Sequence, residues 1–476
     1  MIQVSEHLNL NYLVKQIKMK TFKNILILAV SLLIIACGKD DEPQNTAPQI
    51  ENQEFTVAED IDETVLIGNL QATDADNDVL TYNITINDDD LFVLTETGEL
   101  SLAVDKTLNY DIAQSHTVTV DVADGINTTT ITVTINITNV ANVYIAGLEE
   151  RVAEQVQRGI LWKDGKNITP SVMLNNSFTI ISMDVFGSDI YAISNKVFYK
   201  NNTAVTTGII TSEHGGGFSS IDVASNGDVY IAGFGSKVTT LAIAGVAKIW
   251  KNGEAMPPLL GTNGDNISSY AHDVFISGTD VYAVGIILNT ATTTHKVVVW
   301  KNGSLHAEIF SGNGLFNDTY PVLNFSIFVK NEAIYVAGAE TNGNKNIAKV
   351  WKNGEATILG AGSEDSYATA LFVTDNNEVY VLGREGENNN RRIKAWKNGA
   401  PLNNFESPNE KAFEGGIAVF NDDVYISGRI KNPDPTISIS GVAVVWKNGE
   451  LTIIGETSSD ANNIGIVTTP TCIVVK

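Results

Sequence analysis

Between residues 143 and 476, short apolar runs alternate with polar turns, and the pattern repeats about every 47 residues. Each repeat carries four runs with the length and the β-branched composition of strands. The first run is mainly apolar and is predicted to be innermost, as in 271–276, and the second carries Val-Tyr-x-x-Gly, as in 281–285. The third ends in tryptophan, as in 296–300, and the fourth follows at once, as in 356–359. Four strands per repeat predict a β-propeller.

The third run of each repeat ends in a Trp-Lys-Asn-Gly tag. Seven tags occur, the first two of them variants, and they start at Trp162, Tyr199, Trp250, Trp300, Trp351, Trp396 and Trp446. Asn-Gly between two strands favours a type I′ turn, because both residues accept positive φ. The tag therefore predicts a hairpin between the third and fourth strands, and the count predicts seven blades. Its tryptophan is interpreted as an anchor between sheets, with a ligand contact as the alternative.

The two ends of the repeat array complement each other. The array begins at 143–147 with a second-strand signature that no first strand precedes, and it finishes at 471–475 with a first strand. Together these fragments predict one blade, so that the C-terminal strand closes a seven-bladed β-propeller and removes open sheet edges. Cys472 then lies in an inner strand as a small core residue.

Ahead of the array the hydrophobic pattern changes to short alternating runs. Residues 79–84, 116–122 and 129–137 place β-branched and polar side chains on opposite faces, as half-buried strands of an antiparallel sandwich do. The fold class is therefore all-β. The predicted domains are a β-sandwich over 46–140 and the propeller over 143–476.

Short motifs across residues 46–140 resemble, in order, those of a bacterial cadherin repeat. They are Asn45-Thr46-Ala47-Pro48, Val57-Ala58-Glu59, Ala72-Thr73-Asp74-Ala75-Asp76, Leu80-Thr81-Tyr82, Phe92, Thr97-Gly98-Glu99-Leu100, Leu108-Asn109-Tyr110-Asp111 and Val120-Asp121-Val122-Ala123-Asp124-Gly125. The resemblance implies a cadherin/Ig-like sandwich whose acidic positions bind calcium, a hard cation that takes about six to eight oxygen ligands.

The cadherin resemblance also implies which residues hold calcium. Four would gather at the membrane-proximal end: Asn45, Asp74, Asp76 and Asp124. Glu59 and Asp111 would gather at the other end. The family's Leu-Asp-x-Glu is Leu-Asn-Tyr-Asp over 108–111, and its acidic exit linker is uncharged over 139–142. Complete sites then need ligands from 38–45 or from the next domain, and a sandwich with solvated acidic turns is the alternative.

The N-terminus has the pattern of an export signal. Lys20 and Lys23 precede an apolar run over 25–35, which is shorter than the about 20 residues that a membrane-spanning helix needs. Ile34-Ile35-Ala36-Cys37-Gly38 resembles a bacterial lipobox, which implies cleavage before Cys37 and lipid attachment to it. The predicted signal peptide is 1–37, with Met19 as an alternative start.

Residues 38–45 form a predicted acidic tether. Within it, Lys39-Asp40-Asp41-Glu42 resembles the signal that sends Bacteroidota lipoproteins to the outer face of the outer membrane. The resemblance implies a surface-exposed outer-membrane lipoprotein, held to the membrane by its lipid. A plain solvated tether is the alternative.

The net charge and the cysteine content limit which binding partners and which stabilising bonds are expected. The net charge of −24 argues against nucleic acid, whose phosphates require clustered Lys and Arg. Two cysteines, Cys37 and Cys472, supply no disulfide framework. The hydrophobic content of 43% fits a folded globular chain.

A ligand site is expected on the propeller face that carries the long, individual loops, because scaffold loops carry function. The candidates are Phe218, Tyr270, Tyr367 and His214, whose rings would contact a sugar or peptide; Arg391 and Arg392 lie in the same loops. Core packing of the rings and a structural role for His214 are the alternatives.

No catalytic motif is present: the sequence has no His-x-x-x-His, no cysteine cluster, no phosphate loop and no Gly-x-Ser-x-Gly. The sequence therefore predicts a non-enzymatic surface protein for calcium-dependent adhesion or ligand binding, with a glycan or protein ligand. A glycan-acting hydrolase or lyase, with carboxylates from different blades, is the alternative.

Overall fold

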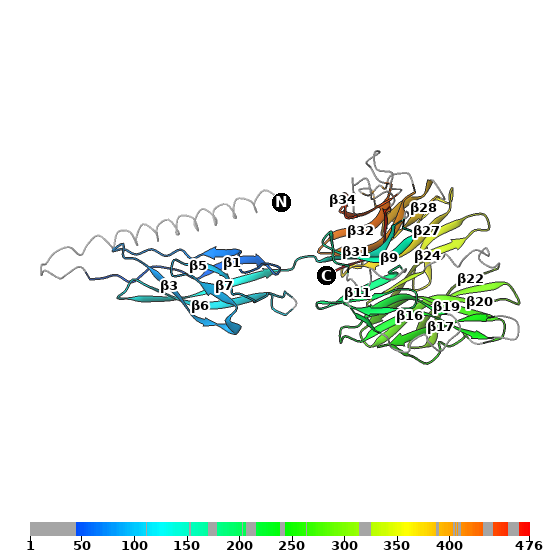
Figure 1. Ribbon diagram of the computed structural model, residues 1–476, viewed down its shortest axis with the longest axis horizontal. Coiled ribbons are helices and arrows are strands. Elements are labelled where there is room, and N and C mark those ends of the chain that lie inside the picture. The colour runs from blue at the N-terminus through cyan, green and yellow to red at the C-terminus, as the bar shows by residue number, and fades with distance from the viewer. Residues whose placement is uncertain are drawn as a thin grey trace, which may run out of the picture. The chain divides into compact units, whose positions relative to one another are not determined.

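The structure is a computed structural model of the 476-residue chain (Figure 1). It describes residues 44–110, 112–151, 154–169, 179–201, 203–205, 216–238, 243–262, 264–313, 325–386, 390–402, 405, 407, 411–431, 441–455 and 466–476. The chain divides into two compact units between Val140 and Ala141. The named elements of the described residues are β-strands and one short 3-10 turn, η1 (Asp88–Asp90). No helix among these residues is long and apolar enough to cross a membrane.

The first unit contains two sheets. The larger has the order β1-β7-β6-β3 and the smaller β2-β5-β4. Their strands are β1 (Gln53–Ala58), β2 (Leu66–Asn69), β3 (Thr81–Asn87), β4 (Phe92–Leu94), β5 (Glu99–Leu102), β6 (Ser115–Ala123) and β7 (Thr128–Thr138). β1 runs parallel to β7, whereas the other pairs are antiparallel.

One apolar core joins these two sheets. Alternate residues of β6, Val118, Val120 and Val122, are at most 1% exposed, and they share the core with Leu100 and Leu102 of β5. A strand with every second side chain buried has one face on the core and one in water. The alternation predicted for 116–122 is therefore present.

The second unit contains seven four-stranded antiparallel sheets among its described residues. The first sheet comprises β35 (Ile466–Val475), β8 (Val143–Arg151), β9 (Val156–Lys163) and β10 (Lys166–Asn167). The second comprises β11 (Ser182–Phe186), β12 (Asp189–Ile193), β13 (Phe198–Lys200) and β14 (Thr203–Val205), and the third comprises β15 (Gly216–Val223), β16 (Val229–Val238), β17 (Ile243–Lys251) and β18 (Glu254–Ala255).

The remaining four sheets follow in chain order. The fourth comprises β19 (Ile267–Ser277), β20 (Asp280–Asn289), β21 (Thr294–Lys301) and β22 (Ser304–Asn313). The fifth comprises β23 (Ser326–Lys330), β24 (Ala333–Thr341), β25 (Asn346–Lys352) and β26 (Glu355–Ile358). The sixth comprises β27 (Ser366–Val373), β28 (Val379–Glu385), β29 (Arg392–Lys397) and β30 (Ala400–Pro401), and the seventh β31 (Phe413–Phe420), β32 (Asp423–Ile430), β33 (Val442–Lys447) and β34 (Glu450–Ile453).

The C-terminal strand belongs to the same sheet as the strand that opens the second unit. β35 pairs antiparallel with β8, from Val475 opposite Val143 to Ile466 opposite Arg151. The first strand of each sheet contacts the first strand of the next, and β31 of the seventh contacts β35 of the first. Apolar clusters also combine consecutive sheets, and one of them places Trp162 with residues of the seventh. The packing contacts therefore form a cycle.

Each part of the Trp-Lys-Asn-Gly tag has a structural role, which the fourth sheet illustrates. Trp300 is 1% exposed and packs between the third and fourth sheets. Lys301 lies over the Tyr282 ring at 5.1 Å. Asn302 and Gly303 have φ values of 50° and 81°, the positive values that a type I′ turn requires. The predicted hairpin turn is present.

The asparagine of the tag also bonds across the sheet. Asn302 Oδ1 accepts the backbone N–H of Val281 at 2.8 Å, and its Nδ2 donates to Asp280 at 2.7 Å. The asparagines at 252, 353, 398 and 448 accept the equivalent backbone N–H. The tag thus links its hairpin to the start of the second strand.

Candidate functional site

Three aspartates converge at one end of the first unit. Asp74, Asp76 and Asp78 each offer a carboxylate oxygen, and these oxygens all lie within 4.8 Å of one another. The backbone N–H groups of Asp76 and Asp78 donate to Asp74 Oδ1 at 2.8 and 3.2 Å, which curls the segment around that carboxylate. Within the described part of the chain this is the one such acidic group.

The second oxygen of Asp74 has no protein partner. Asp74 Oδ2 is buried and accepts no hydrogen bond from the part of the chain that the structure describes. A buried carboxylate oxygen without a donor loses its hydration and gains nothing in return. A cation coordinated by this oxygen would supply the missing interaction, and oxygen-only ligands suit a hard cation such as calcium. The residues present therefore fit the group that the sequence implies.

Asn45 and Asp124 form a second group at this end. Asn45 Nδ2 donates to Asp124 Oδ2 at 2.9 Å. Asp124 Oδ1 accepts the backbone N–H groups of Ile126 and Asn127, and the bond from Asn127 is the main reason why the pKa of Asp124 is lowered. Oδ1 of Asp124 thus serves the turn that joins β6 to β7, and its Oδ2 binds Asn45.

A backbone contact connects the two groups. The N–H of Thr46, next to Asn45, donates to Asp76 Oδ2 at 2.7 Å. Of the predicted ligands Asn45, Asp74, Asp76 and Asp124, the structure brings Asp74 and Asp76 within shared-ligand distance and pairs Asn45 with Asp124. Sequence reasoning missed Asp78, although the Asp-x-Asp-x-Asp spacing of 74–78 was a visible signal.

At the other end of this unit, Glu59 ties backbone segments together. Its Oε2 accepts the N–H of Tyr110 at 2.9 Å, and its Oε1 accepts the N–H of Val140 at 3.0 Å. Its predicted co-ligand Asp111 lies outside the described residues, as do Cys37 and His214. Glu59 therefore acts here as a structural clamp.

Two of the predicted ligand-binding rings pack against other aromatic rings in the second unit. Phe218 is 4% exposed and meets Trp250 edge-on at 5.1 Å between centroids. A ring enclosed to this degree has no free face for a ligand, so the packing alternative describes Phe218. Tyr270 is half-buried, contacts Phe234 edge-on at 5.0 Å, and has its pKa raised by burial.

Tyr367 is held between polar groups. Asn346 Nδ2 donates to its hydroxyl at 2.8 Å, and the guanidinium of Arg384 lies 4.4 Å from its ring centre. Arg384 follows β28's Val-Tyr-x-x-Gly signature and is paired in register with Tyr367. One ring face is therefore already covered by a cation.

The seventh sheet repeats this arrangement with an additional arginine. Phe413 and Arg429 are paired in register, and the Arg429 guanidinium lies 3.7 Å from the ring centre. The guanidinium of Arg391 lies 4.4 Å from the same ring. Sequence reasoning placed Arg391 near the ligand face but missed Phe413 and Arg429, whose juxtaposition depends on strand register.

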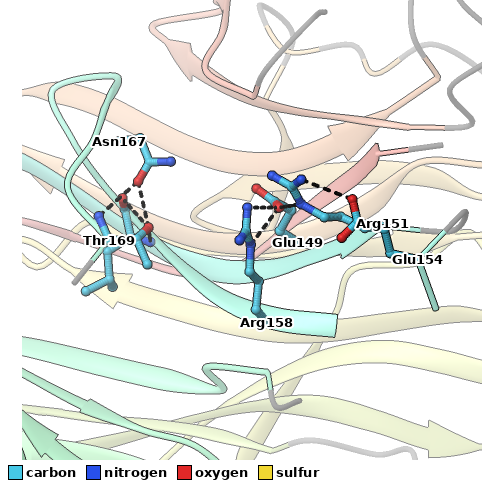
Figure 2. A network of polar contacts seen from close by, with 7 residues as sticks. Glu149, Arg151, Glu154, Arg158, Asn167 and Thr169 are labelled. Carbon is cyan, nitrogen blue, oxygen red and sulfur yellow. Dashed lines mark hydrogen bonds and ion pairs between the residues drawn. The ribbon is translucent and has the colours of Figure 1, made fainter. Parts of the chain in front are cut away.

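A different arrangement neutralises two arginines of the first sheet. Figure 2 shows Arg151 and Arg158 both reaching Glu149, at 2.8 and 2.6 Å, with Glu154 at 3.4 Å from Arg151. The Glu149 side chain is only 2% exposed. Nearby, Asn167 accepts hydrogen bonds from Thr169 in the turn that follows β10. The buried Glu149 is thus paired with two arginines of its own sheet.

Comparisons with known proteins do not assign this chain to a family. The chain matches no family model and no curated protein. Among solved structures, the first two cadherin repeats of human mucin-like protocadherin align at 25% identity over 21% of this chain and 56% of that one, with a TM-score of 0.19. A quinoprotein alcohol dehydrogenase-like protein from Bacteroides thetaiotaomicron aligns at 10% identity over 90% and 98%, with a TM-score of 0.30.

A third similar structure is a glycoside hydrolase. The family GH32 β-fructofuranosidase of Bombyx mori, crystallised with sucrose, aligns at 9% identity over 62% of this chain and 89% of that one, with a TM-score of 0.30. At such scores these likenesses carry no functional conclusion.

Proposed function

We propose that this chain is a cell-surface lipoprotein for calcium-dependent adhesion or ligand binding. In this proposal Cys37 carries the lipid anchor, 38–45 is an acidic tether, and the first unit is a cadherin-like, calcium-binding spacer. The second unit is the binding head. The observation that carries the proposal is the buried, unpartnered Asp74 Oδ2 inside the Asp74, Asp76 and Asp78 group.

The binding head is proposed to be a seven-bladed β-propeller closed by the C-terminal strand. In support, β35 shares a sheet with β8, and contacts between first strands run in a cycle through seven sheets. The two sheets of the first unit, with one core between them, support a cadherin-like sandwich. The motifs over 46–140 provide the family assignment in this proposal.

Calcium would be held by Asp74, Asp76 and Asp78, with Asn45 and Asp124 beside them. Three carboxylates carry enough negative charge to bind a divalent cation, and the ion would compensate the orphan oxygen of Asp74. Bound calcium would stiffen the segment that Thr46 connects to this group, next to the tether. A second site at Glu59 and Asp111 stays a prediction.

Titration calorimetry of the whole chain with calcium tests this function. We expect heat of binding and a higher unfolding temperature in millimolar calcium, both lost in Asp74→Asn. Asp105→Asn is the matched control, because Asp105 is exposed and has a positive φ that asparagine tolerates. Absence of heat and of a thermal shift in the unmodified chain would reject the calcium proposal.

Anchoring and localisation require a separate experiment. Cys37→Ser should move the protein from the membrane fraction to the soluble fraction and abolish incorporation of a labelled fatty acid. Protease added to intact cells should digest the anchored protein if it lies on the outer face of the outer membrane. A protein that stays membrane-bound and protected in both tests contradicts this part of the proposal.

One observation favours a second candidate, a glycan-acting enzyme. Asp222 and Asp184 lie on neighbouring first strands, and burial, followed by the charge of Asp184, raises the pKa of Asp222 to about 8. A carboxyl that keeps its proton at neutral pH can act as the general acid in glycoside hydrolysis. A glycan array combined with a hydrolysis screen separates the candidates: binding without turnover favours the binding head, and turnover lost in Asp222→Asn favours the enzyme.

A further inference from the structure

An arginine appears in the last two repeats where four of the five earlier repeats place an apolar side chain. The residue that follows the glycine of the second-strand signature is Arg384 in the sixth sheet and Arg429 in the seventh. The corresponding residues of the earlier repeats are Leu148, Asn195, Phe234, Ile286 and Ala339. Placing a cation at a packing position costs desolvation free energy, so each arginine needs compensation.

Arg384 has that compensation within the protein. Its Nη1 lies 2.5 Å from Glu414 Oε1, and both side chains are largely buried, at 14% and 7% exposure. Its guanidinium also stacks on Tyr367. The charge-assisted hydrogen bond and the ring together account for this cation.

Arg429 lacks an equivalent carboxylate. Its Nη1 donates to the hydroxyl of Thr469 at 2.9 Å, and its Nε is buried without a hydrogen-bond partner among the described residues. Among the described residues, no carboxylate forms an ion pair with it. Burial, and then the charge of Arg391, lower its pKa to about 10, against a weaker opposing effect of Glu150. This cation is therefore incompletely neutralised.

Two guanidinium groups consequently share one aromatic ring. Arg391 and Arg429 lie 4.4 and 3.7 Å from the centre of Phe413, and all three side chains are partly exposed. The Glu149 network in Figure 2 shows how the same chain neutralises two arginines when a carboxylate belongs to the fold. Around Arg429 the described residues supply no such carboxylate.

We propose that Phe413, Arg391 and Arg429 form an anion-binding site, the Phe413 cluster, for the carboxylate or sulfate group of an acidic polysaccharide. Guanidinium groups bind both anions through paired N–H donors, and the Phe413 ring on which both of them lie holds the two groups together. The chain carries a net charge of −24, so it repels polyanions in general, and binding depends on this local site. The inference rests on the proposed binding function and names its ligand class.

Affinity electrophoresis of the whole chain tests the site with polygalacturonate, dextran sulfate and neutral dextran. Binding to polygalacturonate assigns a carboxylate ligand, and binding to dextran sulfate assigns a sulfate. Arg429→Gln should weaken binding about tenfold or more, because it removes a charged donor from the site. Arg151→Gln is the matched control and should change binding less than about twofold, since Arg158 still pairs with Glu149.

Arg429→Met separates binding from folding. Methionine restores the apolar character that four of the five earlier repeats have at this position, so we expect an unfolding temperature equal to or above that of the unmodified chain. Polyanion binding should nevertheless be lost. Binding that survives in Arg429→Met, equal losses in Arg429→Gln and Arg151→Gln, or no binding to either polyanion would overturn the inference.

Failure of this site differs from failure of the proposed function. If the polyanions do not bind but the chain still binds neutral glycans, proteins or cells, the Phe413 cluster is wrong and the binding function stands. If the chain binds none of these and calcium produces no heat, the proposed function is wrong.

Discussion

The carboxylate of Asp184, on β11, accepts the backbone N–H of Val223, on β15 of the next sheet, at 2.8 Å. Asp222 and Asp273 repeat this link on the two following first strands, at 2.6 and 2.9 Å. Three half-buried aspartates thus connect four consecutive sheets of the second unit. A buried carboxylate that accepts a backbone N–H stabilises the contact between two sheets. Negative charges on neighbouring carboxylates disfavour its ionised form.

The Asp184 and Asp222 pair predicts that alkaline pH destabilises the second unit. Burial, and then the charge of Asp184, raise the pKa of Asp222 from 3.8 to about 8, so the folded state binds the proton more tightly than the unfolded chain. This stabilisation is complete below about pH 4 and is lost as the pH rises through about 8. Burial also raises the pKa of Asp273, which acts in the same direction.

Thermal unfolding between about pH 5 and about pH 9 measures this effect. Asp222→Asn, which resembles the protonated acid, should flatten the decline and unfold at a higher temperature than the unmodified chain at the alkaline end. Asp228→Asn is the control, because hydrogen bonding to Lys251 lowers the pKa of Asp228 to about 2, outside this range. Identical slopes for Asp222→Asn and the unmodified chain would contradict the assignment.

The burial of Trp300 predicts how much the tag contributes to the free energy of unfolding. Its ring is 1% exposed between two sheets, and its Nε1 donates to the carbonyl of Leu260 at 2.9 Å. Trp300→Ala should therefore lower the free energy of unfolding by about 3–5 kcal/mol. Leu305→Ala, at a 50% exposed position paired with Trp300, should cost about 0.5 kcal/mol or less. Similar costs for both variants would refute the anchor role.

The repeated sheets could be predicted because their signal is local and recurs. A hairpin needs only the Asn-Gly pair and its flanking strands, and burial of the tryptophan follows from its regular place beside that hairpin. The hydrogen bonds of Asn302 could not be predicted, since Val281 and Asp280 reach it across the sheet. Strand order within each repeat determines that contact, and a linear pattern does not display it.

The candidate sites were predictable only in part. The cadherin resemblance supplied Asp74 and Asp76, but it did not supply Asp78, whose carboxylate comes near them through the curl of the segment. The orphan oxygen of Asp74 depends on three-dimensional burial. The pairing of Phe413 with Arg429 depends on strand register, which the bulge between Glu414 and Ile417 shifts.

The positive φ of Asn302 predicts that replacement by glycine and replacement by alanine lower the free energy of unfolding by different amounts. Asn302→Gly keeps the φ of 50° without strain but loses two side-chain hydrogen bonds, so it should cost about 1–2 kcal/mol. Asn302→Ala loses the same bonds and adds about 1 kcal/mol or more for a left-handed conformation. Unfolding temperatures should therefore rank unmodified, glycine and alanine from high to low, and equal values for glycine and alanine would argue against the strain.

Substitutions of Asp78 and Asp124 should differ in how much they weaken calcium binding. Asp78 belongs to the converging carboxylates, whereas both oxygens of Asp124 already accept hydrogen bonds from its turn and from Asn45. Asp78→Asn should weaken calcium binding about tenfold, because it removes one ligand charge. Asp124→Asn should weaken it less while lowering the unfolding temperature in the absence of calcium.

Calorimetry of the two variants beside Asp105→Asn makes this comparison, with unfolding measured in chelator to isolate the effect on the turn. A larger loss for Asp78→Asn supports a site centred on Asp74, whose buried Oδ2 then gains its partner from the ion. A larger loss for Asp124→Asn would mean that calcium displaces the amide of Asn45 from Asp124, as the family ligand set implies. That outcome would move the site from the Asp74, Asp76 and Asp78 group to the turn after β6.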